Sequence, residues 1–297
     1  MWNKRGYAAI AMDTCGYVSD RATPAKPWSP TKKHHEFGGP AGWGGFDQID
    51  EPVTDQWSYH AVVAAILAHS LIRSFPEIDH KRTGVTGISW GGYLTDIVSG
   101  VDPRFRFAAP VYGCGFLGED SAWLTNLEKM GTERAKKWLS LWDPSVYLPN
   151  SKIPMLWVTG TNDFAYPFPS LQKSYRLPKG RRTLAIRVRM RHNHQDGAEP
   201  GEIRAFADAI LNKGAPLPRI TRTSSDSVEY KSKRPVVKAE LNYTKDAGRW
   251  QDRKWESVPA PLDAESHKVT AEIPAGAKAW YINLFDDDGL VVSSEHK

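Results

Sequence analysis

Residues 87–92, Gly-Ile-Ser-Trp-Gly-Gly, constrain the fold of this 297-residue chain more than any other feature. They follow a short apolar run at residues 83–86, typical of a buried strand, and precede residues 93–98, which predict a helix. A Ser in Gly-x-Ser-x-Gly between strand and helix predicts a sharp turn that lifts the hydroxyl away from a sheet. The helix that follows aims N–H groups and its positive dipole end at the same point. We therefore expect Ser89 to be placed as a nucleophile.

A purely structural turn is the alternative interpretation of this motif. Gly-x-Ser-x-Gly occurs by chance in many chains, and it has meaning only between a strand and a helix. The apolar strand before the motif and the additional Gly92 after it favour the functional interpretation.

The composition is that of an ordinary globular protein, with 40% hydrophobic and 25% charged residues. No apolar run approaches the roughly 20 residues of a membrane span, so we expect no membrane partner. Cys15 and Cys114 form neither a disulfide framework nor a ligand cluster, which predicts two buried thiols and no metal site. The net charge of +5 is concentrated between Lys173 and Arg191. A solvated face explains it better than an anionic partner does, and we expect no nucleic-acid partner.

The first 54 residues predict one strand and one long loop. Residues 1–6 are neither a signal peptide nor a targeting arm. Residues 7–12 form a continuous apolar run, which predicts a strand buried on both faces. Residues 14–54 are rich in Pro, Gly and Trp, and a loop of this length is typically a lid or a binding loop. Trp28 and Trp43 are candidates to line a substrate cleft, although a loop Trp more often packs its own loop.

Helical and strand patterns then alternate along the chain. Apolar residues at three- and four-residue spacing predict a helix over residues 54–75, which Pro76 ends. Strands are predicted at residues 105–111, 153–159 and 183–190, a helix at 198–211, and a short helical insertion at 117–150. This alternation indicates an α/β fold with a mostly parallel sheet that is covered on both faces.

The pattern changes after Pro218. Short alternating segments at residues 236–241, 268–273 and 279–284 are separated by turn residues, which predicts a small antiparallel β domain. We therefore expect an α/β domain over residues 1–214 and a β-sandwich-like domain over 219–297. The β domain has no visible chemistry, so its role is either structural or the binding of a polymer.

Three groups are predicted at the carboxyl ends of successive strands: Ser89, Asp163 and the pair His192 and His194. Open α/β sheets bind ligands along that edge, and nucleophile, acid, histidine is the chain order of one hydrolytic arrangement. A neutral imidazole can take the Ser89 proton during attack on a carbonyl and return it to the leaving group. Asp163 would hold the tautomer and stabilise the imidazolium.

The base could be either histidine. The preceding strand is expected to end near Met190, and the base must lie in a loop that reaches back over Ser89. We therefore prefer His194 and assign His192 a supporting or substrate-facing place.

The remaining parts of the site are predicted less directly. Asp102 and Asp196 could replace Asp163 as the acid, but neither directly follows a strong strand. The oxyanion hole is expected to use the backbone N–H of Trp90, the residue after the nucleophile. A second donor should come from an earlier strand–helix loop.

These motifs together resemble the α/β-hydrolase superfamily. The resemblance rests on residues 87–93, on Asp163 in a Gly-x-x-Asp turn and on His-x-His before the last helix, and residues 55–60 and 112–116 add to it. Within the superfamily the chain is most similar to acetyl xylan esterase-like and dienelactone hydrolase-like members, near the prolyl oligopeptidase group. The resemblance covers about residues 1–214. It implies a three-layer sandwich with a trailing β domain, and a serine esterase that needs no cofactor.

The chain departs from this superfamily at one point. Residues 7–12 correspond to its fourth strand, and the third strand, which carries the second oxyanion donor, should precede them in sequence. This chain has no residues for it, so we expect either a fragment of a longer gene product or a gap filled by another segment or chain. Loss of one donor typically costs about 2.7–4 kcal/mol, some 10²–10³ in turnover, so an intact triad could retain weak activity.

Three functions remain open from the sequence. The leading hypothesis is a serine esterase that acts on a short-chain acyl ester, with a small-molecule or carbohydrate alcohol, through an acyl-enzyme. A peptidase is the first alternative because residues 92–93 also resemble oligopeptidases, although no propeller repeat precedes the elbow. A non-catalytic polysaccharide-binding protein is the second. The acyl group, the alcohol and the compartment stay open, as does the oligomeric state, with a homo-oligomer among the alternatives.

Overall fold

The computed structural model describes residues 2–18 and 33–297, which form two compact units. The first contains the described part of Met1–Lys81 together with Thr125–Asp143, and the second contains Arg82–Leu124 and Pro144–Lys297. The predicted domain division near residues 214–219 does not coincide with these units and stays a prediction. Within the described residues, no helix is both long and apolar enough to cross a membrane.

The first unit is mostly helical. Its elements are η1 (Asn3–Arg5), β1 (Tyr17–Val18), β2 (Lys33–His34), η2 (Phe46–Gln48), η3 (Val53–Asp55), α1 (Trp57–Ser74), most of α3 (Leu124–Met130) and α4 (Thr132–Trp142). Trp57 and Trp138 are completely buried. Their indole N–H groups donate to the carbonyls of Thr14 and Gly44, at 2.8 and 2.7 Å. Helix tryptophans therefore anchor the long loop at Thr14 and at Gly44.

The predicted strand at residues 7–12 is wrong. The segment is not in a strand, has no ladder partner among the described residues, and leaves Ile10 42% exposed. A strand of a parallel sheet needs neighbours that satisfy its backbone hydrogen bonds and cover its apolar side chains. An apolar run can fit such a position, but it cannot supply the neighbours.

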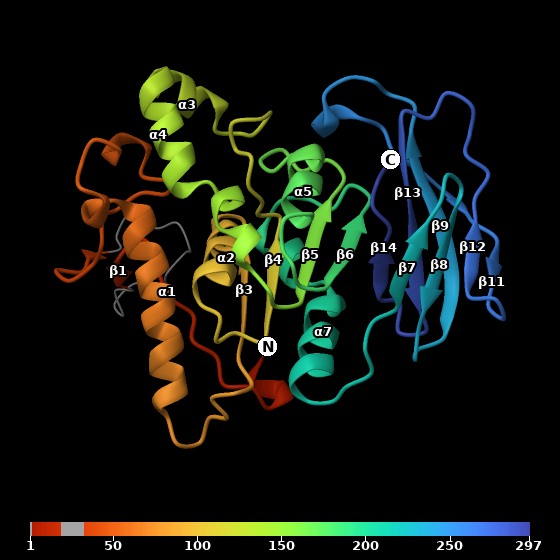
Figure 1. Ribbon diagram of the computed structural model, residues 1–297, viewed down its shortest axis with the longest axis horizontal. Helices are drawn as coiled ribbons and strands as arrows, with labels where there is room; N and C mark the ends of the chain where they lie inside the picture. The colour runs from red at the N-terminus through yellow and green to blue at the C-terminus, as the bar shows by residue number, and fades with distance from the viewer. Residues whose placement is uncertain (1, 19–32) are drawn as a thin grey trace. The chain divides into compact units, whose positions relative to one another are not determined.

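The second unit contains a four-stranded parallel sheet in the order β3-β4-β5-β6 (Figure 1). Its strands are β3 (Gly84–Ile88), β4 (Phe107–Val111), β5 (Met155–Gly160) and β6 (Arg182–Arg187), and its helices are α2 (Trp90–Val101), α5 (Phe168–Tyr175), α6 (His194–Ala198) and α7 (Gly201–Leu211). All residues of β4 and β5 are buried, as expected for central strands covered on both faces. Helix α2 packs on β3 and β4, and α7 packs on β4. The predicted α/β fold is thus confirmed.

The register of this sheet aligns the strand ends. Ile88 at the end of β3 pairs with Val111 at the end of β4, and Val111 pairs with Val158 near the end of β5. Side chains that follow these strands therefore meet along one edge. Among the described residues β3 pairs with β4 alone, so it is an edge strand.

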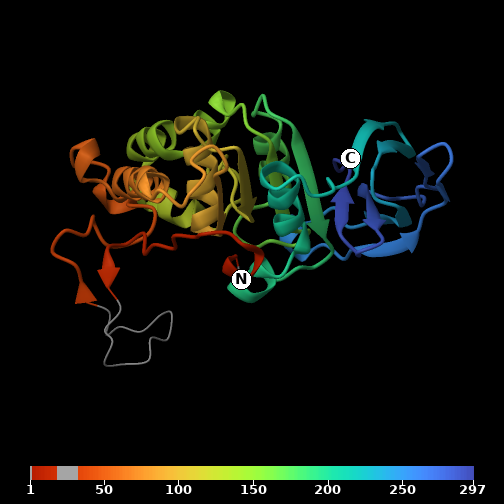
Figure 2. The same ribbon diagram turned by 90° about the horizontal axis from the view of Figure 1, so that it is seen from below.

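A pair of antiparallel sheets follows, as predicted. The strands are β7 (Arg219–Thr223), β8 (Ser227–Lys231), β9 (Val236–Thr244), β10 (Glu256–Pro259), β11 (Leu262–Asp263), β12 (Lys268–Thr270), β13 (Ala279–Asp286) and β14 (Val291–Ser293), in the orders β10-β9-β13-β14 and β11-β12-β8-β7. Side chains from both sheets share one core, including Val228 and Leu241. Figure 1 shows the dark blue strand β14 beside β6, and Figure 2 shows the antiparallel strands from below. The Ser293 hydroxyl of β14 accepts the Ile186 N–H of β6 at 2.8 Å, which fastens the antiparallel strands to the parallel sheet.

Candidate active site

Ser89 lies in a strained turn between β3 and α2. Its φ of 60° and ψ of −118° form a conformation that non-glycine residues rarely adopt. The Ser89 N–H donates to the Val111 carbonyl at 3.0 Å, which ties the turn to β4. A Cβ on Gly87 would lie 2.2 Å from the Gly91 carbonyl oxygen, so only glycine fits before the turn. The strand–turn–helix context that gives the motif its meaning is therefore present.

Ser89, His192 and Asp163 form a continuous hydrogen-bonded chain. His192 Nε2 lies 2.8 Å from Ser89 Oγ, and His192 Nδ1 lies 2.8 Å from Asp163 Oδ2. The Asp163 side chain is 1% exposed and the His192 side chain 10%. Because a carboxylate only accepts, the hydrogen belongs on Nδ1, and Nε2 is left with a lone pair that faces the hydroxyl.

The other oxygen of Asp163 is held by the turn that follows β5. Asp163 Oδ1 accepts the backbone N–H groups of Ala165 and Tyr166, both at 2.8 Å. These two donors stabilise the buried carboxylate and fix its orientation toward the imidazole. The neighbouring Asn162 donates from its side-chain amide to the carbonyls of Gln251 and Arg253, at 3.0 and 2.7 Å. The β domain therefore supports the turn that carries the acid, a role that its sequence gave no sign of.

The preference for His194 over His192 is wrong in geometry. Strand β6 ends at Arg187, three residues before the predicted end, so His192 already lies five residues beyond the strand. His194 is the first residue of α6, whose N-cap is Asn193. The loop thus reaches Ser89 two residues earlier than expected, and the helix has begun by residue 194.

Aromatic rings surround the imidazole of His192. The Tyr112 ring stacks on it at 4.3 Å between centroids with 24° between planes, and the Tyr166 ring lies nearly parallel at 6.1 Å. The Phe164 ring is tilted by 60° at 4.9 Å. These rings enclose the imidazole and restrict its orientation. Sequence reasoning did not place any of the three rings against the histidine, although each follows the carboxyl end of a strand by at most six residues.

Tyr112 also holds the backbone beside the histidine. Its hydroxyl donates to the Arg191 carbonyl at 2.6 Å, and its φ of 67° is positive. Burial raises the pKa of Tyr112 well above its ordinary value, so the hydroxyl remains a neutral donor. Tyr112 therefore orients His192 both through its ring and through the preceding peptide.

Trp90 is the first residue of α2, which places its backbone N–H at the helix N-terminus beside Ser89. Its side chain is buried, and the ring lies 4.7 Å from that of Trp123. In the second unit no strand–helix loop precedes β3 among the described residues, so the predicted second oxyanion donor has no counterpart there.

The two loop tryptophans remain untested as substrate-binding residues. Trp28 lies outside the described residues. Trp43 is 44% exposed and belongs to the first compact unit, whereas Ser89 belongs to the second. Their predicted place at a substrate cleft therefore stays a prediction.

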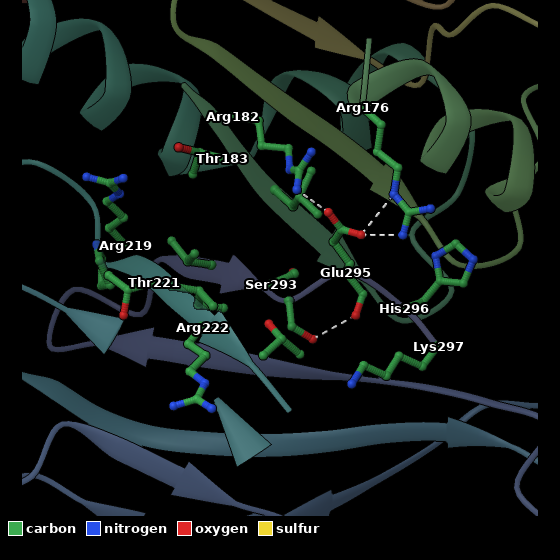
Figure 3. Close-up of a pocket in the computed structure, with 16 residues that line it drawn as sticks. Arg176, Arg182, Thr183, Arg219, Thr221, Arg222, Ser293, Glu295, His296 and Lys297 are labelled. Carbon is green, nitrogen blue, oxygen red and sulfur yellow. Dashed lines mark hydrogen bonds and ion pairs between the residues drawn. The ribbon is translucent and has the colours of Figure 1, made fainter. Parts of the chain in front are cut away.

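A cavity of about 380 Å³ lies away from this site (Figure 3). It is lined by Arg182, at the start of β6, whereas His192 follows the end of that strand. Six strand residues span roughly 17 Å, so a small substrate cannot contact both places. Figure 3 shows Arg176 and Arg182 directed at Glu295, and the Arg176 Nε donates to that carboxylate at 3.0 Å. These ion pairs connect the end of α5 and the start of β6 to Glu295, near the end of the chain.

An acidic cluster at Asp286, Asp287 and Asp288 has oxygen atoms close enough to share a cation. Arg234 already lies against it, 2.5 Å from Asp288 and 3.5 Å from Asp286. The guanidinium supplies the positive charge that a metal ion would bring.

Comparison with solved structures gives similar but partial matches. An acetyl xylan esterase from Paenibacillus sp. R4 is 21% identical, with 53% of this chain and 54% of that chain covered and a TM-score of 0.48. Acetyl xylan esterase 1 from Thermoanaerobacterium sp. JW/SL YS485 is 17% identical, with 59% of each chain covered and a TM-score of 0.48. An acylaminoacyl peptidase from Pyrococcus horikoshii is 22% identical over 48% of this chain and 24% of that chain, with a TM-score of 0.40. The chain thus spans less than two thirds of the length of these proteins.

Comparison with curated protein sequences finds no significant match. The model of the prolyl oligopeptidase family matches residues 53–211, more than half of the chain. The match includes Ser89, Asp163 and His192 and the parallel sheet that brings them together. The chain therefore belongs to the prolyl oligopeptidase family, within the α/β-hydrolases.

Proposed function

We propose that the chain is a serine hydrolase that cleaves short-chain carboxylic esters of the acetyl type, with Ser89 as nucleophile, His192 as general base and Asp163 as the acid that orients it. The observation that carries the proposal is the pair of 2.8 Å contacts from His192 to Ser89 and to Asp163. Acetyl esters of carbohydrates are the narrower form of the proposal.

The reaction proceeds in two halves. In the first, Ser89 Oγ attacks the ester carbonyl carbon while His192 Nε2 takes the hydroxyl proton. The oxyanion develops beside the Trp90 N–H, and its collapse expels the alcohol, which takes the proton from His192. In the second, a water molecule gives a proton to His192 and attacks the acyl-enzyme. Collapse of this intermediate releases the acid, and Ser89 Oγ takes the proton back from His192.

The Trp90 N–H at the start of α2 lies beside Ser89 and is the oxyanion donor in this proposal. It would stabilise the tetrahedral intermediate formed from an ester or from an amide, so substrate assays distinguish the two classes.

Peptide hydrolysis is the second candidate, and the family match favours it. Parallel incubation with p-nitrophenyl acetate and an aminoacyl p-nitroanilide separates the two activities. We expect release of p-nitrophenol from the ester, little p-nitroaniline from the amide, and loss of ester turnover in Ser89→Ala. Faster cleavage of the anilide would favour the peptidase. Glycan binding without turnover of either compound, unchanged in Ser89→Ala, would favour a non-catalytic protein.

A further inference from the structure

Phe164 is an exposed ring in otherwise buried aromatic surroundings. Tyr112, Tyr166 and Trp90 near the site are at most 8% exposed, whereas Phe164 is 58% exposed. Phe164 is also the single aromatic residue among the large exposed hydrophobic side chains described in the second unit. A structural support for His192 would be expected to be covered, as Tyr112 is. The exposure of Phe164 beside the imidazole therefore needs another explanation.

The backbone fixes Phe164 in this position. It lies at the tip of the turn in which Asp163 Oδ1 binds the N–H groups of Ala165 and Tyr166. The same carboxylate holds His192, so the acid places the imidazole and the Phe164 ring together, 4.9 Å apart. The backbone that carries the ring is thus in place before a substrate binds, which reduces the entropy lost on contact.

Proton transfer identifies the part of the substrate that lies closest to this ring. In the proposed reaction His192 delivers its proton to the leaving oxygen, whereas the acyl group stays bonded to Ser89. The leaving oxygen must therefore be within hydrogen-bond reach of Nε2. The centroid of the Phe164 ring lies 4.9 Å from that of the imidazole. The alcohol portion must approach the imidazole, whereas the acyl chain need not, so the ring is expected to meet the alcohol portion.

We propose that Phe164 is a platform for the alcohol portion of the ester, and that it selects alcohols with a flat, apolar ring face, such as an aryl group or the C–H face of a sugar. This assignment rests on the proposed function. The platform would determine which leaving alcohols the site accepts, and it would not affect the preference for the acyl group.

Substrate pairs test the platform directly. Comparison of phenyl acetate, xylose tetraacetate and ethyl acetate varies the alcohol, and comparison of phenyl acetate with phenyl butyrate varies the acyl chain. Because aromatic contacts are modest, we expect Phe164→Ala to reduce kcat/KM for the ring-bearing acetates about five- to tenfold, with little effect on ethyl acetate. A loss with one of them alone would restrict the platform to aryl or to sugar rings. The ratio of kcat/KM for phenyl butyrate to that for phenyl acetate should not change.

Val146→Ala, which truncates another half-exposed apolar side chain of the second unit, is the matched control and should retain wild-type kinetics.

Two kinetic results would overturn the proposal. An equal loss for ethyl acetate and for the ring-bearing esters would mean that Phe164 acts through His192. A changed acyl-length preference would place the ring on the acyl side.

Binding without turnover separates this proposal from the function on which it rests. Saturation-transfer NMR with phenyl acetate and the Ser89→Ala variant should detect binding of the phenyl ring. The signal should persist in the double variant Ser89→Ala/Val146→Ala and weaken in Ser89→Ala/Phe164→Ala. Contact that does not depend on Phe164 would overturn the platform even if the wild-type protein is an esterase. Ring-dependent contact in a protein that hydrolyses no ester would overturn the proposed function and leave the platform.

Discussion

Replacement of Asp163 by Asn should invert the hydrogen-bonding pattern of the site. The two backbone donors at Ala165 and Tyr166 need an oxygen at the Oδ1 position. The Asn side chain must therefore turn its NH₂ group toward His192 Nδ1, which then has to accept a hydrogen bond. The imidazole proton moves to Nε2 and points at Ser89, so the ring cannot take the hydroxyl proton.

This change of tautomer should reduce kcat by about 10⁴, equal to ~5.5 kcal/mol of activation free energy. The assay is steady-state hydrolysis of p-nitrophenyl acetate near pH 7, with thermal unfolding followed in parallel. The melting temperature of Asp163→Asn should stay close to that of the wild type because both Oδ1 contacts persist. Asp196→Asn, which alters the half-buried carboxylate that pairs with Arg191, is the control and should keep its activity. If Asp163→Asn retained more than about a tenth of wild-type kcat, the triad reasoning would be refuted.

Three further substitutions test the surroundings of the site and the packing of the second unit. Tyr112→Phe leaves the Arg191 carbonyl without its donor, so kcat should fall about tenfold with KM unchanged, and a wild-type kcat would contradict a positioning role. Burial lowers the pKa of His296 from 6.5 to about 3, so the unfolded chain alone binds a proton between these pH values. The contribution of this group to the free energy of unfolding should be fully present above pH 6.5 and should fall by about 1.4 kcal/mol for each pH unit below it. Urea unfolding at pH 7 and pH 5 measures the loss, and His296→Phe should lose correspondingly less stability between the two pH values. Gly92→Ala places a Cβ 2.5 Å from the Val111 carbonyl oxygen, so the melting temperature should fall by the equivalent of ~1–3 kcal/mol, and an unchanged melting temperature would argue against close packing of α2 on β4.

The parts of the site that closely follow strands could be predicted from the sequence. Ser89 follows β3 and Asp163 follows β5. β5 is fully buried, whereas no residue of β3 is buried because β3 lies at the edge of the described sheet, so the expectation of a buried strand before Ser89 is wrong. The parallel register then brings their ends to one edge without any information on side-chain contacts. The strand and turn patterns around Ser89 and Asp163 depend on neighbouring residues in the chain, so they can be recognised in a single sequence.

The parts that depend on distant neighbours could not be predicted. The apolar run at residues 7–12 matches a buried strand, but burial is a property of partners and not of the run itself. The choice between His192 and His194 depended on where β6 ends, and strand ends are the least certain feature of a pattern. The support of Asn162 by the β domain joins residues 89 and 91 positions apart, and no local signal marks it.

The central claim is that His192 activates Ser89, and covalent labelling by a fluorophosphonate tests it most directly. Mass spectrometry of the modified peptide should find the label on Ser89. His194→Ala should be labelled at the wild-type rate, whereas His192→Ala should react about 10²–10⁴ times more slowly. Labelling of a residue other than Ser89, or a His192→Ala variant that reacts as fast as the wild type, would contradict the account.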